Sequence, residues 1–254
     1  MNILIPMSGR GSRFSLNGYE TPKPFINFFG KPMIEHVLDN MGIDNTFTLC
    51  VLREHYEQYT ELFAMLGKKV FQLNLVLIDK VTRGAADTCL LASMFIKPKE
   101  LLLIANSDQL MKWDQYNFLN KMSKDKLDGC MFVFNKNDPA YSYVEVDDNG
   151  IAIRTAEKQV ISEYATTGIY VWARGEDFIW AAQKMIKHEI THAGEYYVCP
   201  VFNENIKEGQ KIGIYRPIEH WNIGTPDDLK YFVKMHPDNV DDFISGSKEY
   251  YENI

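Results

Sequence analysis

The sequence lacks a surplus of positive charge and has no long apolar run. Its 254 residues carry 27 Lys and Arg against 34 Asp and Glu, a formal net charge of −7. Nucleic acids and anionic membranes need a basic protein surface, so this charge argues against both as partners. No segment approaches the roughly 20 apolar residues of a membrane span, and no basic stretch followed by an apolar segment opens the chain. We therefore expect a soluble, cytoplasmic protein.

Cysteines are few, and none forms a Cys-x-x-Cys pair. The four thiols are far apart in the sequence, at Cys50, Cys89, Cys130 and Cys199. This spacing favours reduced, mostly buried thiols over a disulfide framework or a zinc site.

Short apolar segments alternate with helical patterns in the first half of the chain. Strands are expected at Asn2–Pro6, Phe47–Leu52, Leu75–Ile78 and Leu101–Ala105, and helices at Pro32–Met41, His55–Leu66 and Ala85–Ile96. Apolar strands that alternate with helices indicate a parallel sheet that is covered on both faces.

The pattern changes after about Gly129, where strand-like segments follow one another. They are Gly129–Asn135, Tyr143–Asp147, Ile151–Lys158 and Ala165–Trp172, and Asp148-Asn149-Gly150 indicates a hairpin between the middle two. Helices are expected again at Glu176–Ile190, at Tyr197–Glu208 and after Thr225-Pro226. The sequence predicts one α/β domain over residues 1–236 with an inserted β region, and a tail or docking helix at 237–254.

A glycine-rich turn follows the first expected strand directly. Backbone N–H groups at such a turn can converge on phosphate, and here they would come from Met7, Ser8, Gly9, Gly11 and Ser12. The turn is no dinucleotide fingerprint, which needs a small residue where Phe14 stands, and no P-loop, which needs Gly-Lys-Ser/Thr.

Three short motifs occur in order: Gly9-Arg10-Gly11-Ser12-Arg13, Pro22-Lys23-Pro24 and Gly30-Lys31-Pro32-Met33-Ile34. Their order and spacing resemble the signature of the sugar-phosphate nucleotidylyltransferases. The loop is most similar to that of small cytidylyltransferases of surface and capsular polysaccharide pathways. The resemblance covers Ile3 to about Leu229. It implies a Rossmann-like three-layer α/β sandwich with a mixed, mainly parallel central sheet and a small inserted β region. It also implies catalytic roles for Arg13 and Lys23, which would neutralise charge on the leaving pyrophosphate.

The base-binding segment of the resembled family matches residues 79–88. A turn of one glycine and two small residues reaches the nucleobase edge there, which points to Gly84 and Ala85. A polar residue five positions earlier reads the base, and Asp79 takes that place. A carboxylate accepts a hydrogen bond from N4 of cytosine and repels O4 of uracil or thymine, so CTP is favoured. An Asp79 that merely ends a strand and faces solvent stays the alternative.

The resemblance implies a Mg²⁺ site made of two residues that are distant in the sequence. Asp108 follows the strand Leu101–Ala105, at a carboxyl strand end where α/β sites assemble, and matches the family's metal aspartate. A motif similar to Trp-x-Asp-x-Gly-Thr then places Asn222 as the second ligand, and its amide oxygen can bind Mg²⁺. A surface aspartate beside an N-capping turn at Thr225 is the alternative.

Shorter matches indicate the pocket for the phosphorylated acceptor. Lys158 would grip the acceptor phosphate and orient it for attack, as a third catalytic residue. The other acceptor-binding residues implied are Asn106, Glu157, Thr167, Gly168 and Tyr197. A solvated lysine and a plain packed strand are the alternative.

His188-Glu189-Ile190-Thr191-His192 also fits the zinc-protease pattern His-Glu-x-x-His, which puts two histidines on one helix face. Gly194 follows too early for the extended form of that pattern, and it indicates that the preceding helix ends nearby. The sequence therefore disfavours a zinc hydrolase.

The predicted reaction transfers a nucleoside monophosphate from a triphosphate to a phosphorylated small molecule and releases pyrophosphate. Sugar 1-phosphates with UTP or dTTP remain open as substrates, as do non-sugar phosphates with CTP. A nucleotide-sugar-dependent glycosyltransferase and a non-catalytic nucleotide sensor are the rival functions. The predicted partners are the triphosphate and the acceptor, and homo-oligomerisation is left open.

Overall fold

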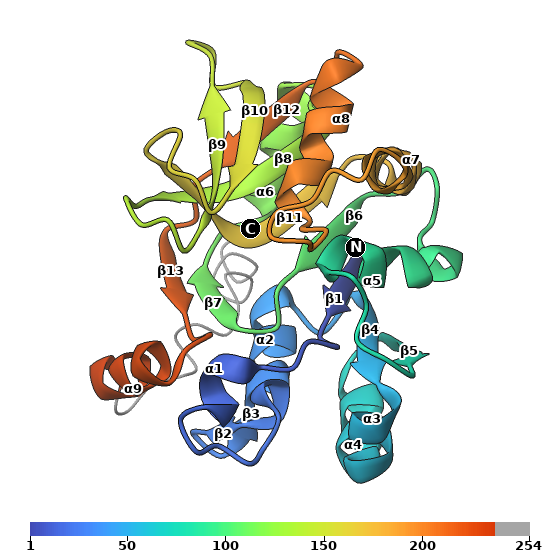
Figure 1. Cartoon of the computed structure of the whole chain (residues 1–254), viewed down its shortest axis with the longest axis vertical. Coiled ribbons are helices and arrows are strands. Elements are labelled where there is room, and N and C mark those ends of the chain that lie inside the picture. The colour runs from blue at the N-terminus through green and yellow to red at the C-terminus, as the bar shows by residue number, and fades with distance from the viewer. Residues whose placement is uncertain (237–254) are drawn as a thin grey trace, which may run out of the picture.

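A computed structural model of the chain describes residues 1–236, arranged around a mixed β-sheet (Figure 1). The predicted tail at 237–254 lies outside the described residues. Nine strands of the described part form the central sheet, in the order β10-β9-β11-β6-β1-β4-β5, and β8 lies between β11 and β12. Their bounds are β1 Asn2–Pro6, β4 Thr46–Leu52, β5 Gln72–Ile78, β6 Leu102–Ala105, β8 Gly129–Asn135, β9 Ser142–Val146, β10 Ala152–Glu157, β11 Tyr164–Trp172 and β12 Ile212–Tyr215.

The strands change direction along the sheet. β1 pairs in parallel with β4 and β6, and β4 pairs in parallel with β5. β11 is antiparallel to β6, to β8 and to β9, while β12 returns in parallel to β8. Two ribbons stand apart from this sheet: β2 (Asn27–Phe28) with β3 (Lys31–Pro32), and β7 (Gln109–Lys112) with β13 (Glu219–Asn222). The mixed Rossmann-like sheet is confirmed.

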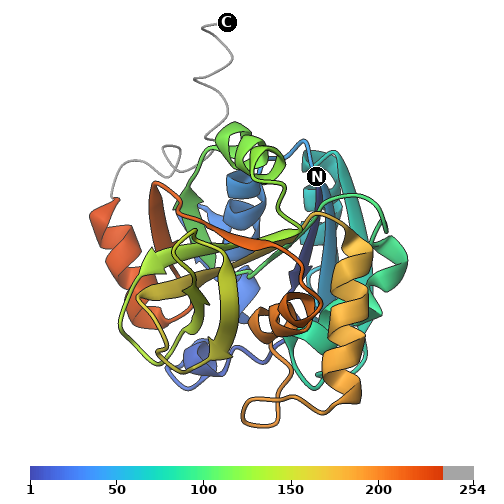
Figure 2. The same cartoon turned by 90° about the horizontal axis from the view of Figure 1, so that it is seen from above.

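Helices cover both faces of the sheet because its strands are apolar on both sides. Along β1, Ile3 and Ile5 point into one buried cluster and Leu4 points into the other. The first cluster takes side chains from α2 (Met33–Met41), α4 (Thr60–Lys69), α6 (Gln115–Lys124) and α9 (Pro226–Met235). The second takes side chains from α5 (Ala85–Leu91), α7 (Gly175–Lys187) and α8 (Phe202–Lys207). Figure 2 shows α6 and α7 on different sides of the strands.

The expected helix His55–Leu66 is two helices in the structure. α3 (Arg53–Gln58) ends and α4 begins on either side of Tyr59, whose φ of −119° and ψ of 33° are not helical. The Tyr59 ring stacks on Phe25 with centroids 4.4 Å apart. The helical periodicity of the sequence does not reveal this tertiary contact.

Three other expected helices have different ends. Instead of starting at Tyr197, the helical segment starts with a 3₁₀ turn at Cys199–Val201, which has Pro200 in its first turn and leads into α8. α5 ends at Leu91 and a 3₁₀ turn follows at Ser93–Phe95, and α7 ends at Lys187.

Several short elements were not expected from the sequence. They are α1 (Ser12–Ser15), the 3₁₀ turn Lys23–Phe25, both two-stranded ribbons, β12 and α6. α6 carries a cap that the sequence does show, because the Asp114 side chain accepts from the N–H of Asn117. The expected hairpin is confirmed, since β9 and β10 pair in antiparallel fashion across residues 147–151. Among residues 1–236 no helix combines the length and the apolarity that a membrane crossing needs.

We expect Trp172→Phe to lower the free energy of unfolding by about 2 kcal/mol. Trp172 is fully buried in β11, its ring stacks on Phe202 at 4.1 Å, and its Nε1 donates to Asn205 Oδ1 at 3.0 Å. Urea unfolding would measure the change. The matched control is Trp180→Phe, because Trp180 is 40% exposed on α7. Equal losses in the two variants would contradict the anchoring role of Trp172.

Candidate functional site

The glycine-rich loop begins where β1 ends. The N–H of Met7 still donates to the carbonyl of Cys50 at 2.9 Å, so the loop leaves the sheet in line with β4. Gly11 has a φ of 59°, and α1 starts at the next residue. A Cβ on Gly11 would lie 2.9 Å from Cβ of Lys23. The loop is therefore packed against the Pro22-Lys23-Pro24 turn, and this contact requires glycine.

Lys23 reaches from that turn to the carboxyl end of β6. Its Nζ lies 2.6 Å from Asp108 Oδ2, and both side chains are about four-fifths buried, with 23% and 18% of their surface exposed. The second sequence motif thus meets Asp108, which is 85 residues from Lys23 in the sequence. Arg13 lies on α1 and is exposed.

Asp108 and Asn222 are brought together by the ribbon of β7 and β13. Asn222 faces Gln109 in the register of this ribbon, and the N–H of Ile223 donates to the carbonyl of Asp108 at 2.9 Å. A Cβ placed on Gly224 would lie 2.5 Å from Asp108 Oδ2 and 3.0 Å from Asn222 Oδ1. The two oxygens therefore border the same small volume, in which Gly224 leaves room.

These residues fit a Mg²⁺ ion. Both groups present oxygen, the atom that Mg²⁺ prefers, and Mg²⁺ is usually held by one or two carboxylates together with substrate phosphates. Among the described residues no group of three or more His, Cys, Asp and Glu side chains could hold a metal by itself. The site accordingly suits an ion that arrives with nucleotide phosphates better than a resident structural metal.

The predicted base-binding turn is tied to the glycine loop and to the predicted acceptor side. Ser8 Oγ lies 3.3 Å from Thr88 Oγ1, which links the loop to the start of α5. Gly84 has a φ of 141°, and a Cβ there would lie 2.4 Å from the carbonyl oxygen of Tyr196. The backbone of Tyr196 bonds to both sides of the turn, through the carbonyl of Arg83 and the N–H of Ala86. Gly84 and Ala85 thus lie beside the chain that leads to Tyr197.

Asp79 lies at the end of β5 and bonds outside the turn. Arg53 Nε donates to Asp79 Oδ1 at 2.6 Å, and 72% of the Asp79 side chain is exposed. Its role as a base reader stays a prediction, and any nucleobase would share the carboxylate with Arg53.

The predicted acceptor-binding residues form two groups. In the first, the N–H of Asn106 donates to the carbonyl of Gly168. The neighbouring Thr167 has a buried hydroxyl that has no hydrogen-bond partner among the described residues. In the second, Lys158 Nζ donates to the hydroxyl of Tyr197 at 2.7 Å. This hydrogen bond raises the pKa of Lys158, so its ammonium stays charged near neutral pH.

Burial shifts the pKa values of Glu157 and His220 in the directions that favour their neutral forms. Burial raises the pKa of Glu157, whose carboxylate accepts a hydrogen bond from Ser142. Burial lowers the pKa of His220 to about 4, against the opposing charge of Asp108. His220 is thus neutral at pH 7, and its ring lies 4.6 Å from that of Phe134.

The His-Glu-x-x-His motif does not have the geometry of a zinc protease. α7 ends before His188, and Glu189 has a φ of 54°, outside the helical range. His192 pairs instead with Glu195 in an isolated β-bridge. The two histidines do not share a helix face, which removes the reason for a zinc site.

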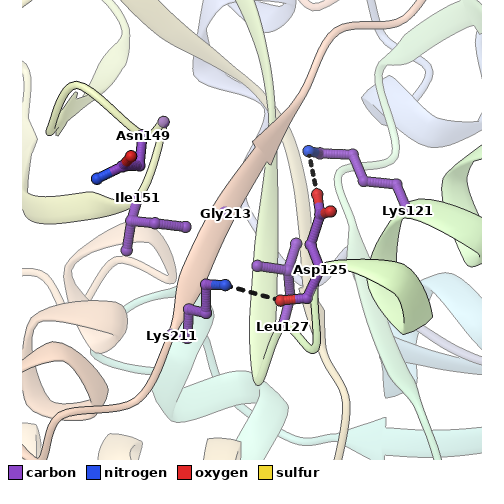
Figure 3. Close-up of a pocket in the computed structure, with 8 residues that line it drawn as sticks. Lys121, Asp125, Leu127, Asn149, Ile151, Lys211 and Gly213 are labelled. Carbon is purple, nitrogen blue, oxygen red and sulfur yellow. Dashed lines mark hydrogen bonds and ion pairs between the residues drawn. The ribbon is translucent and has the colours of Figure 1, made fainter.

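A cavity of about 360 Å³ lies away from all these residues, between the end of α6, the start of β12 and the β9–β10 turn (Figure 3). Two lysines line it, and both bond to Asp125: Lys121 to its carboxylate and Lys211 to its carbonyl oxygen. None of the predicted site residues lines this cavity, so we assign it no role in the reaction.

Three residues near the metal pair were missed in the sequence. Asp228 accepts a hydrogen bond from Asn222, and His220 lies close enough to Asp108 to sense its charge. Tyr141 is half-buried, and burial and the charge of Asp228 raise its pKa. The sequence indicated only Asp228, because its spacing from Thr225 is typical of a helix start.

The fold is a Rossmann-like sandwich, and the predicted site brings a glycine loop together with a lysine and two side-chain oxygens, an arrangement that suits the phosphates of a nucleotide. The chain belongs to the nucleotidyl transferase family, whose profile matches residues 3–232.

Curated relatives are longer than this chain. A bifunctional protein GlmU from Methanocaldococcus jannaschii is 25% identical over 259 residues, which cover 100% of this chain and 58% of the relative. Another from Herminiimonas arsenicoxydans is 23% identical over 250 residues, which cover 94% and 53%. The chain thus spans little more than half the length of these relatives.

Solved structures share the fold over their full length. A nucleoside-diphosphate-sugar pyrophosphorylase from Vibrio cholerae RC9 has a TM-score of 0.78 and 25% identity, covering 91% of this chain and 99% of that one. An inositol-1-phosphate CTP transferase from T. maritima has a TM-score of 0.72 and 18% identity, covering 96% and 97%. At this identity, the second similarity concerns the fold alone.

We expect Glu157→Gln to raise stability at about pH 7.5 and not at about pH 4. Because the pKa of Glu157 is raised in the folded state, folding favours the protonated acid. Protonated Glu157 therefore contributes its full stability below pH 4.5, the ordinary pKa of glutamate, and this stability is lost as the pH rises through the raised pKa. Glutamine keeps a neutral amide in the same place. Urea unfolding at the two pH values would measure the difference. Glu145→Gln, at a partly exposed carboxylate on β9, is the control and should show no gain.

Proposed function

We propose that this chain is a Mg²⁺-dependent nucleotidylyltransferase that joins a nucleoside monophosphate to a phosphorylated small molecule and releases pyrophosphate. The single observation that carries the proposal is the Lys23–Asp108 pair, which lies between the glycine loop and the Asn222 oxygen. One cationic side chain and two oxygen ligands there can serve a triphosphate together. We infer that residues 1–236 act as one such domain.

The reaction we propose is a displacement at the α-phosphorus of the triphosphate. An oxygen of the acceptor phosphate forms a bond to the α-phosphorus, and the bond to the bridging oxygen of the leaving pyrophosphate breaks. Because the acceptor phosphate is already anionic near neutral pH, no general base is needed. Mg²⁺, when bound by Asp108 and Asn222, would neutralise phosphate charge.

The chain's own residues would bind and orient the two substrates. The amides of the glycine loop would hold the triphosphate, and Arg13 and Lys23 would neutralise the charge that builds up on pyrophosphate. Lys158 would bind the acceptor phosphate. It follows β10 with a φ of 52°, and its Nζ donates to the hydroxyl of Tyr197. Asn106, Glu157, Thr167 and Gly168 would line the acceptor's remaining part.

We propose CTP as the preferred nucleotide and the biosynthesis of capsule or other surface polysaccharide as the context. Arg53 bonds to Oδ1 of Asp79, and we assign the other oxygen, Oδ2, to N4 of cytosine. The four free, buried cysteines suit a reducing compartment such as the cytoplasm. Sugar-1-phosphate uridylyl or thymidylyl transfer is the alternative within the same reaction class.

Pyrophosphate release from a panel of substrates tests the reaction. CTP, UTP, dTTP, ATP and GTP would each be combined with sugar 1-phosphates, phosphocholine, glycerol phosphate and phosphoglutamine. We expect pyrophosphate from CTP with one class of acceptor, and Asp79→Asn should reduce the preference for CTP over UTP by about tenfold. Release of a nucleoside diphosphate from nucleotide sugars would support a glycosyltransferase instead, and no product with nucleotide binding alone would support a sensor.

We expect Arg13→Ala and Lys23→Ala each to lower kcat by about 10² or more while the Kd of the triphosphate changes far less. Charge on the leaving group is greatest in the transition state, so the loss falls on turnover. Steady-state kinetics and isothermal titration would separate the two effects. Lys99→Ala, at an exposed lysine remote from the site, is the control. Turnover equal to that of the wild type would refute the assigned roles.

A further inference from the structure

An asparagine at a metal-ligand position raises a problem that an aspartate does not. The two ends of the Asn222 side chain have similar shape, but only the oxygen can bind a cation, and the NH₂ group would repel it. The amide must therefore be held in one of two orientations. In the structure Oδ1 faces Gly224 and shares with Asp108 Oδ2 the volume described above.

The Tyr141 hydroxyl, which also bonds to the Asn222 side chain, can donate or accept, so it does not select an orientation. Two other contacts do. Asn222 Nδ2 donates to Asp228 Oδ2 at 2.7 Å, and Oδ1 accepts from the N–H of Gly224 at 3.1 Å. A carboxylate can only accept hydrogen bonds, so Asp228 selects the end of the amide that carries hydrogen. Rotation of the amide by half a turn would set Oδ1 against the Asp228 carboxylate and Nδ2 against the N–H of Gly224. Both contacts would then be repulsive.

Asp228 is itself held in place by the start of α9. Its N–H donates to Thr225 Oγ1 at 3.1 Å, and Thr225 Oγ1 donates to Asp228 Oδ2 at 2.7 Å. In the usual capping box the acidic side chain would turn back to the N–H of the capping residue. Here the carboxylate turns to the Asn222 side chain, a contact that the start of a helix does not require.

We propose that Asp228 is a positioning residue that directs the Asn222 oxygen toward Asp108, which makes an amide usable as a metal ligand. This inference rests on the proposed function, because it assumes the metal pair of Asp108 and Asn222. Asp228 also places a negative charge behind the amide, where asparagine lacks the charge that an aspartate would supply. Residues that orient a metal ligand in this way commonly change metal affinity by about 10–100-fold.

The proposal predicts different effects of one substitution in two backgrounds. With Asn222 present, Asp228→Ala frees the amide to turn and weakens metal binding. In Asn222→Asp, position 222 has no amide to orient, and its carboxylate would stand beside that of Asp228, so like charges repel. There, Asp228→Ala frees no amide, and relief of the repulsion offsets the loss of its charge, so metal binding is not weakened. A residue that only starts α9 would weaken binding in both backgrounds.

The experiment is a double-mutant cycle with Mn²⁺ as the probe. Electron paramagnetic resonance would measure Mn²⁺ binding to the wild type, Asp228→Ala, Asn222→Asp and the double variant, each with the triphosphate that gives turnover in the panel. We expect about tenfold weaker binding for Asp228→Ala in the wild type and no weakening in Asn222→Asp. Equal weakening in both backgrounds, or none in the wild type, would overturn the proposal.

Controls separate this role from the fold and from the reaction itself. Asp227→Ala removes the neighbouring, exposed carboxylate of the same helical turn and should leave Mn²⁺ binding unchanged. Urea unfolding would monitor stability, and if Asp228→Ala does not fold, Asp228→Leu, which keeps a side chain of similar size but has no acceptor, takes its place with the same expected signs. If the wild type binds no Mn²⁺ with any triphosphate, the metal pair fails together with this inference. If it binds Mn²⁺ and releases pyrophosphate while Asp228→Ala equals the wild type, only the positioning role fails.

Discussion

The contact between Lys23 and Asp108 is the interaction on which the arrangement of the site depends. A carboxylate at the end of β6 would be costly to bury alone, and the lysine of a turn far away in the sequence compensates its charge at 2.6 Å. To reach it, the turn must pack against the glycine loop, which the close approach of Gly11 to Lys23 allows. One ion pair thus fixes the glycine loop, the Pro-Lys-Pro turn and the end of β6 relative to one another.

The same constraint links the two substrate regions. The carboxyl ends of β1 and β6 lie side by side because these strands pair in parallel. From this edge the ribbon of β7 and β13 carries Asn222 to Asp108, and the chain around Tyr196 joins the base-binding turn to the acceptor side. Backbone hydrogen bonds therefore connect the predicted nucleotide and acceptor regions.

The sequence predicted well where a local pattern determines structure. Apolar strands such as β1 and β4, the hairpin between β9 and β10 and the glycine turn after β1 depend on near neighbours, and they were found within a few residues. The helix break at Tyr59 and the delayed start before α8 were missed, because ring stacking and a proline-led 3₁₀ turn decide them. The β7–β13 ribbon was missed for a related reason, since strands of four residues have too weak a pattern until they pair.

The amino-acid sequence by itself determined the α/β class and the family, and it named the lysine, the aspartate and the asparagine of the proposed site. A motif is defined by the identity and spacing of its residues, so it can be recognised in the sequence alone. Only the tertiary structure decided which groups meet. Lys23 bonds to Asp108, and Arg53 bonds to Asp79. Asp228 accepts a hydrogen bond from the Asn222 amide. Such contacts join residues through the folding of the chain, and neither composition nor periodicity contains the orientation of a side chain.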